Sequence, residues 1–412
     1  MSQPEQPKAQ PAKIREYAIV TGAYWGFTLT DGALRMLVVL YFHQLGYGAL
    51  SIAFLFLFYE FFGVVTNLFG GWLAARFGLN RTLFYGLSLQ VCALLLLSIE
   101  SWLSIPYVMA VQALSGIGKD LNKMSAKSSL KLLVSDDAQG KLFKWVSILT
   151  GSKNTLKGVG FFLGGLLLST LGFVHALWLM ALVLLTITLL TKALLSDELG
   201  KKPFKPKFKE MLSKSRAINV LSGARFFLFG ARDIWFVVAL PVYLQSQLGW
   251  HHTEVGTLLA AWVIGYGLVQ SMTPKLLGFT SSQRAPTAKT TIMWVSILLL
   301  MPVLMLLSGL YGLSMQTVVI AGLLSFAVVF AINSAVHSYL ILAYSKADDV
   351  SLDVGFYYMA NAGGRLVGTL LSGLIYQYFG FLACIGGSAL MILACVLVSL
   401  KLPQEQRQHA TH

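Results

Sequence analysis

Twelve windows of mostly apolar residues follow one another along the 412-residue chain. Each is long enough to cross a membrane, because a helix needs about 20 such residues to span the hydrocarbon core. With 56% hydrophobic and only 12% charged residues, the composition excludes an ordinary soluble enzyme and a disordered chain. The sequence therefore predicts an all-α membrane protein whose twelve transmembrane helices cover approximately residues 17–42, 50–75, 82–99, 104–126, 143–168, 173–194, 217–245, 254–277, 290–309, 314–342, 354–378 and 381–400.

Lys and Arg collect in alternate links between these predicted spans. The links 43–49, 169–172, 246–253, 310–313 and 379–380 contain neither residue type, whereas 196–216 is strongly basic. Cytoplasmic loops gather Lys and Arg, so both termini are expected in the cytoplasm. The expected order is an N-terminal tail, a first six-helix half, a basic cytoplasmic linker, a second six-helix half and a C-terminal tail, at residues 1–16, 17–195, 196–216, 217–401 and 402–412.

The two halves carry a weak internal repeat. Residues 22–47 align with residues 223–250, and the Lys-x-x-Gly-x-x-x-Gly-Gly run at 157–165 aligns with Arg-x-x-Gly-x-x-x-Ser-Gly at 365–373. The first predicted span thus pairs with the seventh, and the fifth with the eleventh. Small residues at four-residue spacing let helix backbones approach closely, so we expect packing roles for Gly160, Gly164, Gly368 and Gly373.

The link between the second and third predicted spans resembles the conserved loop motif of the major facilitator superfamily. Its matching residues are Gly71, Arg76, Gly78 and Arg81, while Ala75 stands where that superfamily usually has Asp. The resemblance implies two six-helix pseudo-repeats that rock about a midplane site to give alternating access. In that superfamily this loop fastens the helices in one conformational state.

Charged side chains inside the predicted spans are the most informative residues. A charge at a helix centre costs about 2.5–3.5 kcal/mol on insertion scales, so such residues usually face the protein interior or a watery cavity. The cations outnumber the acids, and at least four must be neutralised by water or by an anion. Eight cations lie deep within the spans and a ninth, Lys127, lies just past the end of its window; the nine are Arg35, Lys119, Lys123, Lys127, Lys153, Lys157, Arg225, Arg232 and Arg365.

A deep cavity lined by Lys and Arg is best interpreted as an anion site, because Arg offers bidentate forks and Lys offers point charges. The candidate substrate-binding residues are Arg35, Lys119, Lys123, Lys153, Lys157, Arg232 and Arg365, with the polar companions Asn122, Asn154, Asn361 and Tyr357. The candidate proton-coupling residues are Asp31, Glu60, Asp120, Asp233 and His337.

Structural roles compete with these functional ones. Asp31 and Arg35 are four residues apart and could form a self-contained pair, whereas the neighbours Arg232 and Asp233 should point apart and not neutralise each other. We expect Lys127 to snorkel to the cytoplasmic surface, and Arg225 could lie near that surface. His337 is more often a satisfied interhelical hydrogen-bonding residue than a proton carrier.

No motif for catalysis, metal binding or nucleotide binding is present. The cysteines Cys92, Cys384 and Cys395 lie far apart in apolar segments, which gives neither disulfide nor metal-ligand spacing. The sequence has no phosphate-cradling loop and no GxSxG elbow. We therefore expect no enzyme activity, no cofactor and no metal, with transport driven by a gradient. Nucleic acid is excluded as a partner, because the cations fall between long apolar runs.

Four long segments, 21–46, 59–71, 115–131 and 151–165, resemble the bacterial organoarsenical efflux permeases, the ArsJ family. The resemblance implies a multi-pass protein of the bacterial inner membrane that exports 1-arseno-3-phosphoglycerate and confers arsenate resistance. It also implies a functional partner, the glyceraldehyde-3-phosphate dehydrogenase that forms this compound from arsenate. The near-equivalence of Arg35 and Arg232 in the repeat is similar to the arginine pair of organophosphate antiporters.

Three other functions stay open from the sequence. The nearest is uptake or exchange of an ordinary sugar phosphate or another organic anion. A membrane sensor that binds an anion without transporting it is a second, and a membrane-embedded transferase is a third. Among the seven histidines only His337 lies well within a span, which disfavours the transferase.

Overall fold

The computed structural model describes residues 9–47, 54–133, 139–195, 215–250, 252–279, 285–346 and 348–403. Most of the expected basic linker and the ends of both tails lie outside these residues. Within the described ranges all regular structure is helical. The helices are α1 (Ala9–Gln44), α3 (Leu57–Phe77), α4 (Leu79–Leu97), the 3₁₀ turn η1 (Glu100–Trp102), α5 (Ile105–Leu133), α6 (Gln139–Leu194), α7 (Arg216–Phe236), α8 (Ala239–Ser246), α9 (His252–Leu276), α10 (Ala288–Leu310), α11 (Met315–Tyr344) and α12 (Val350–Ser399).

Two of these helices are each two membrane spans joined at a glycine. Gly172 in α6 has φ 75° and Gly380 in α12 has φ 80°, a left-handed conformation that glycine adopts without steric cost. Eight helical stretches are long and apolar enough to cross a membrane, with α7 and α8 counted as one. Each glycine break divides one long helix into two spans, which adds two to the eight. The more polar helices α1 and α5 add two more, so the described residues contain twelve spans.

Close glycine contacts hold α1 against α6 and α7 against α12. A Cβ atom on Gly160 would lie 2.7 Å from the carbonyl oxygen of Leu29, and one on Gly368 would lie 2.5 Å from that of Gly230. These distances leave no room for a side chain, so the backbones touch directly. The packing role expected from the repeat is confirmed for Gly160, Gly164 and Gly368, but Gly373 has nothing within 4 Å of its Cβ position.

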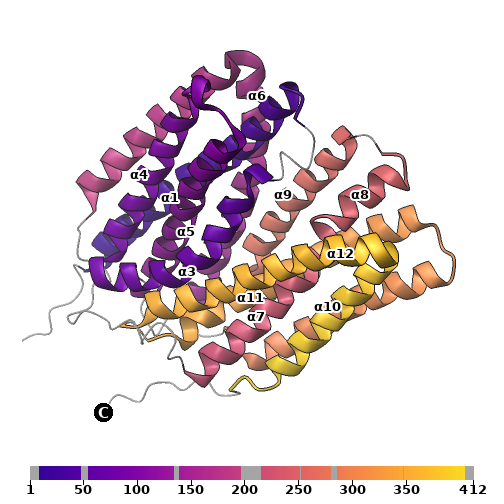
Figure 1. Ribbon diagram of the computed structural model, residues 1–412. Helices are drawn as coiled ribbons and strands as arrows, with labels where there is room; N and C mark the ends of the chain where they lie inside the picture. The colour runs from indigo at the N-terminus through magenta and orange to yellow at the C-terminus, as the bar shows by residue number, and fades with distance from the viewer. Residues whose placement is uncertain are drawn as a thin grey trace, which may run out of the picture.

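Two bundles lie side by side, the first half (α1 to α6) and the second half (α7 to α12) (Figure 1). We call the end of the molecule where α1 begins and α12 ends the terminal end. There α3 meets α12 and α6 meets α9 across the boundary between the halves. A Cβ on Gly71 would lie 2.5 Å from the carbonyl oxygen of Ser351, and one on Gly151 would lie 2.4 Å from that of Gly267. The terminal end is therefore tightly closed.

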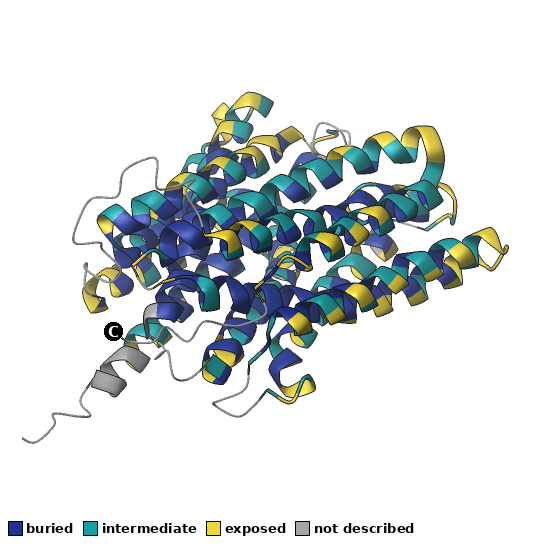
Figure 2. Ribbon diagram, turned by 90° about the horizontal axis from the view of Figure 1, so that it is seen from below, coloured by how far each residue is buried: buried dark blue, intermediate teal, exposed yellow. Residues whose placement is uncertain are grey.

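Toward the opposite end the halves separate. Gly158 of α6 still packs on Ile264 of α9, but Phe162, one turn further along α6, is 71% exposed. Phe61 of α3 and Leu370 of α12 are also exposed, at 50% and 60%. Figure 1 shows the two bundles diverging away from the terminal end. Figure 2 shows buried residues in the interior and exposed residues along the outer faces and at the helix ends. The two halves therefore form a V that closes at the terminal end.

Adding a side chain at the α3–α12 crossing should prevent this closure. A Cβ on Gly355 would lie 2.7 Å from the carbonyl oxygen of Asn67, so Gly355→Leu is expected to force the terminal end apart. Spin labels at Phe77→Cys and Lys346→Cys, one in each half, should report a longer distance. Gly373→Leu is the matched control, because the same helix has open space there. An unchanged distance in Gly355→Leu would contradict the packing described here.

Candidate functional site

Glu60 lies at the centre of the charged residues inside the bundle. Its carboxylate accepts a hydrogen bond from Nη2 of Arg35 at 3.2 Å, and Nζ of Lys119 and Nη1 of Arg365 lie 3.9 and 3.8 Å from it. The three cations come from α1, α5 and α12, and therefore from both halves. Lys119 is also 3.7 Å from Asp120. The Glu60 side chain is 34% exposed, so this meeting point borders the open side of the V.

Further ion pairs extend from Glu60 into each half. In the second half, Nε of Arg365 donates to Asp233 at 3.1 Å, and Nε of Arg232 donates to the same buried carboxylate at 2.6 Å. In the first half, Nζ of Lys123 donates to Asp120 at 2.5 Å. We call the connected set the central cluster: Arg35, Glu60, Lys119, Asp120, Lys123, Arg232, Asp233 and Arg365.

One sequence expectation about an ion pair was wrong, and one open alternative is not realised. Arg232 and Asp233 were expected to point apart, yet they pair directly, because the long Arg232 side chain folds back to its neighbour. Asp31 and Arg35 do not pair with each other. Asp31 instead accepts a hydrogen bond from the Tyr59 hydroxyl at 2.6 Å, and Arg35 turns toward Glu60. Tertiary contacts between α1 and α3 thus override the helical spacing.

Lys153 and Lys157 on α6 face the central cluster without a carboxylate partner among the described residues. Both are partly exposed. Lys153 is within electrostatic range of Lys119, Arg365 and Asp120, and Lys157 is within range of Arg35, Asp31 and Glu60. These acids already interact with Tyr59 or with other cations of the site. The two lysines therefore increase the excess of cations over acids, which water or an anion can balance.

The polar companions divide into two groups. Nδ2 of Asn154 donates to Gln270 at 2.7 Å, and Gln270 donates to Ser334 at 3.0 Å, so this amide chain joins the two halves. Asn122 is different, because it is fully buried and its Nδ2 donates to the carbonyl oxygen of Gly118 within its own helix. Asn122 therefore does not reach the central cluster in this structure, and its contact with a substrate stays a prediction.

Below the central cluster, toward the terminal end, lies a second group of buried polar residues. Nε of Arg225 donates to Asn361 at 2.9 Å, and the fully buried Tyr357 ring lies under the same guanidinium. His337 is fully buried, and neither ring nitrogen has a hydrogen-bond partner. Lys127 is 2% exposed, which contradicts the expected snorkelling. Arg225 is 3% exposed and does not lie at the surface.

Sequence reasoning missed Tyr59, the residue before Glu60. Its hydroxyl donates to Asp31, and its ring centroid lies 3.8 Å from Nζ of Lys119 and 5.3 Å from Cζ of Arg35. Such cation–π contacts help hold cations in place. An aromatic residue in an apolar helix is usually a packing residue, so only its position beside Glu60 could have pointed to this role.

The loop-motif residues lie at the terminal ends of α3 and α4. Gly71 packs against the start of α12, and Gly78 has φ 98° in the turn between α3 and α4. Arg76 places its guanidinium 5.0 Å from the ring centroid of Trp72. These residues therefore shape the closed terminal end and do not contact the central cluster.

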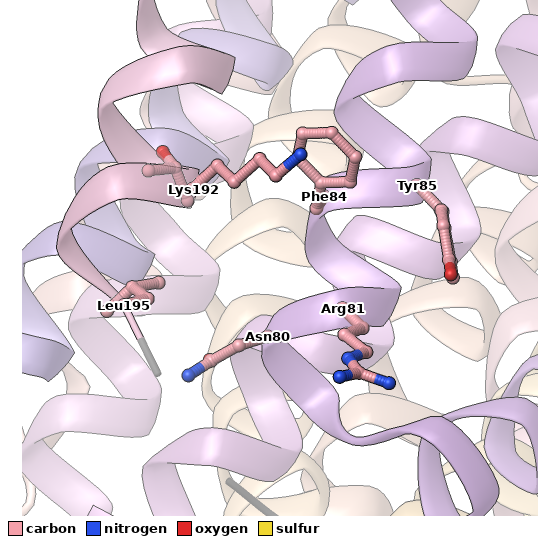
Figure 3. A pocket seen from close by; sticks show the side chains of 7 residues that line it. Asn80, Arg81, Phe84, Tyr85, Lys192 and Leu195 are labelled. Atoms are coloured by element: carbon pink, nitrogen blue, oxygen red, sulfur yellow. The ribbon is translucent and has the colours of Figure 1, made fainter. Parts of the chain in front are cut away.

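Arg81, the last motif residue, lines a separate cavity of about 250 Å³ between α4 and α6 (Figure 3). Lys192 enters the same cavity from α6, with Nζ 4.9 Å from the ring centroid of Phe84. This cavity lies on one bundle and not between the halves. It is distinct from the central cluster.

The fold and the ion pairs across it can now be compared with known proteins. The profile described as Major Facilitator Superfamily matches residues 20–341 and again residues 221–412. The chain belongs to the major facilitator superfamily. This membership confirms the expected twelve-helix fold and identifies a secondary transporter, not an enzyme. No curated protein sequence matches the chain.

Solved structures of other superfamily members have the same fold. The human organic anion transporter MFSD10 (TETRAN) is 17% identical, with a TM-score of 0.71, over 96% of this chain and 100% of that one. The E. coli fucose:proton symporter FucP is 14% identical, with a TM-score of 0.73, over 96% and 100%. A bacterial homologue of the iron transporter ferroportin, in an outward-facing state, is 15% identical, with a TM-score of 0.72, over 93% and 99%.

Removing one carboxylate of the central cluster should destabilise this major facilitator protein. Asp120 is 2% exposed and lies beside two lysines. Breaking a buried ion pair by removing one partner costs about 3–5 kcal/mol. We expect Asp120→Asn to lower the melting temperature of the purified protein, and the added Lys123→Met to restore part of it. Glu100→Gln, at an exposed glutamate, is the control. If Asp120→Asn melts at the same temperature as Glu100→Gln, the ion pairing of Asp120 is contradicted.

Proposed function

We propose that this major facilitator protein exports a small organic polyanion across the bacterial inner membrane, and that its cargo is 1-arseno-3-phosphoglycerate. The terminal end is then the cytoplasmic end, with both termini in the cytoplasm. Export of this compound removes arsenate that a glyceraldehyde-3-phosphate dehydrogenase has built into it. The expected phenotype is arsenate resistance.

One observation carries the proposal: cations from both halves gather in one place and exceed the carboxylates there. Arg35 and Lys119 of the first half meet Arg365 of the second half, and Lys153 and Lys157 add charge without a described partner. A molecule with a phosphate at one end and an arsenate at the other carries several negative charges. Such a cargo suits a broad cationic surface better than it suits one arginine pair.

The resemblance of four long sequence segments to organoarsenical efflux permeases supports this cargo. The human protein MFSD10, which has the same fold, is an organic anion transporter. Thiol chemistry would suit trivalent arsenic, whereas pentavalent oxyanion esters are held by cations. The only cysteines, Cys92, Cys384 and Cys395, are far apart in the sequence, which agrees with an oxyanion cargo.

The V-shaped arrangement suggests how transport proceeds. With the terminal end in the cytoplasm, the described conformation is outward-facing and corresponds to the release of an exported cargo. A bound polyanion contacts cations of both halves, so it draws the halves together around the site as they rock. Outward movement of each negative charge is favoured by about 2.3 kcal/mol per 100 mV of inside-negative potential. Proton antiport would add driving force, and Glu60 is the most exposed acid of the cluster.

Everted membrane vesicles give the decisive experiment. Labelled 1-arseno-3-phosphoglycerate should accumulate inside vesicles that contain the wild-type protein and should not accumulate with Lys153→Ala or Lys157→Ala. Lys144→Ala, an exposed lysine at the start of the same helix, is the matched control and should transport normally. In cells with equal protein levels, Lys153→Ala and Lys157→Ala should lose arsenate resistance, and Lys144→Ala should retain it.

Two other results would overturn the proposed cargo. Accumulation of an ordinary sugar phosphate in place of the organoarsenical would assign the same cations to organophosphate exchange. Binding of the organoarsenical without any accumulation would indicate a sensor. Normal accumulation in both lysine variants would remove the site assignment while leaving transport intact.

A further inference from the structure

Two buried cations on the terminal side of the central cluster have no carboxylate partner. Lys127 of α5 and Arg225 of α7 are 2% and 3% exposed, and neither forms an ion pair with a described residue. Nζ of Lys127 donates one hydrogen bond, to Thr150 at 2.6 Å. Arg225 donates to Asn361 and, at 3.4 Å, to the carbonyl oxygen of Ser334. Neutral acceptors solvate these groups without neutralising them.

The two cations come from opposite halves and meet across a pair of tyrosines. Nζ of Lys127 lies 5.2 Å from the ring centroid of Tyr358, and Cζ of Arg225 lies 5.2 Å from that of Tyr357. The two ring centroids are 5.0 Å apart. Lys127 is within electrostatic range of Lys123 and Lys153 in its own half and of Arg225, whose like charge repels it across the boundary. This repulsion acts between the halves, at the end of the molecule where they are closed.

Several buried hydrogen-bonding groups lie near the same position. The hydroxyls of Tyr357 and Tyr358 interact with that of Ser338. Both ring nitrogens of His337 lack a hydrogen-bond partner, and all these residues are at least nine-tenths buried. An unsatisfied buried polar group costs about 1–3 kcal/mol. Hydroxyl and imidazole groups can all donate hydrogen bonds, so the position offers donors and positive charge together. That combination binds an anion.

The size of the position selects the kind of anion. All the residues that surround it are at most 8% exposed, because the halves are packed together there. Solvent reaches Glu60 of the central cluster, whose side chain is 34% exposed, but it does not reach this closed position to the same extent. This close packing excludes an organic polyanion, so only a monatomic anion or a very small oxyanion is a candidate.

We propose that a small inorganic anion, chloride by its size and charge, binds between Lys127 and Arg225 and holds the two halves together at the terminal end. The bound anion converts a repulsive contact into an attractive one. Its release leaves two like charges facing each other, which favours separation of the halves there. The conformational equilibrium of the transporter therefore depends on chloride. This inference does not depend on the identity of the cargo.

The test uses the full-length protein in detergent, with sodium chloride replaced by sodium gluconate at constant ionic strength. Chloride should raise the melting temperature of the wild type and shorten the distance between spin labels at Phe77→Cys and Lys346→Cys. Lys127→Met and Arg225→Met should each raise the half-maximal chloride concentration by about tenfold or more, because losing one charge-assisted bond changes affinity by that order.

Three matched variants locate the effect. Lys127→Arg keeps the positive charge and should keep the chloride response. If Lys127→Met does not fold, Lys127→Arg and Arg225→Met still test the proposal. Lys144→Met, at the exposed start of α6, should respond as the wild type does. Arg35→Met should also respond normally, because Arg35 belongs to the central cluster and is not among the charges that act on Lys127. Chloride acting at the central cluster would be weakened in this variant. A chloride response that is absent in the wild type, or unchanged in Lys127→Met and Arg225→Met, overturns the proposal.

Discussion

Transport is expected to fall about 100-fold or more when Arg365 is replaced by methionine, since each 1.4 kcal/mol of lost interaction is a factor of ten. Arg365 is the cation that connects the halves through carboxylates, at 3.8 Å from Glu60 and 3.1 Å from Asp233. Its loss removes a cation available to the cargo and leaves Asp233 with Arg232 alone. Initial rates of organoarsenical accumulation in everted vesicles provide the measurement.

Two variants separate the charge of Arg365 from its shape. Arg365→Lys keeps the positive charge but loses the planar fork that reaches two carboxylates at once, so its rate should be intermediate. Lys401→Met removes an exposed cation just beyond the end of the same helix and should leave transport unchanged. If Arg365→Met transports as fast as Lys401→Met, the contact of Arg365 across the halves is not needed for transport.

The second large effect is expected for Glu60→Gln. The Glu60 carboxylate lies within 4 Å of Arg35, Lys119 and Arg365, which is the position that an oxyanion of the cargo needs. Glutamine has nearly the same shape without the charge, so it should no longer compete with the cargo. We expect the dissociation constant of the polyanion to fall about tenfold, which corresponds to about 1.4 kcal/mol.

Stability should change in the opposite direction without the cargo. Glu60→Gln leaves three cations close together, so its melting temperature should fall below that of the wild type and recover when the polyanion is added. Titration calorimetry and thermal melts on the purified protein measure both effects. Glu100→Gln, an exposed acid outside the cluster, controls for loss of one negative charge. Weaker polyanion binding in Glu60→Gln would assign Glu60 a direct role in holding the cargo.

Sequence periodicity was a reliable guide to the helices and to their closest contacts. Apolar windows predicted the spans because each must satisfy its own backbone hydrogen bonds in lipid. The repeated glycines of the fifth and eleventh spans predicted close packing, and Gly160 and Gly368 do touch the facing backbones of α1 and α7. Gly373 meets nothing within 4 Å, and the aligned Gly165 has only one ordinary contact, at 3.6 Å, so this pair of glycines does not lie at the close helix contacts.

Individual side-chain partners could not be predicted in the same way. Spacing along one helix predicted that Arg232 avoids Asp233, which was wrong. It left a pairing of Asp31 with Arg35 open, and Asp31 instead accepts a hydrogen bond from Tyr59. Asn122 carries a polar group typical of a binding site, yet it bonds within its own helix. A side chain chooses its partner from whatever neighbouring helices bring near it, and single-helix spacing does not contain that information.

The sequence by itself determined that this protein is a helical membrane transporter with two related halves and a surplus of positive charge in its spans. Those properties depend on the composition, on the spacing of apolar residues and on the number of charges. Each can be read from short segments or by summing over residues. Only the tertiary structure decided that Arg365 and Glu60 meet across the halves and that Lys127 and Arg225 are buried at the closed end. The reason is that long-range contacts depend on how the two halves are tilted against each other, and a rocking transporter must be able to change that tilt.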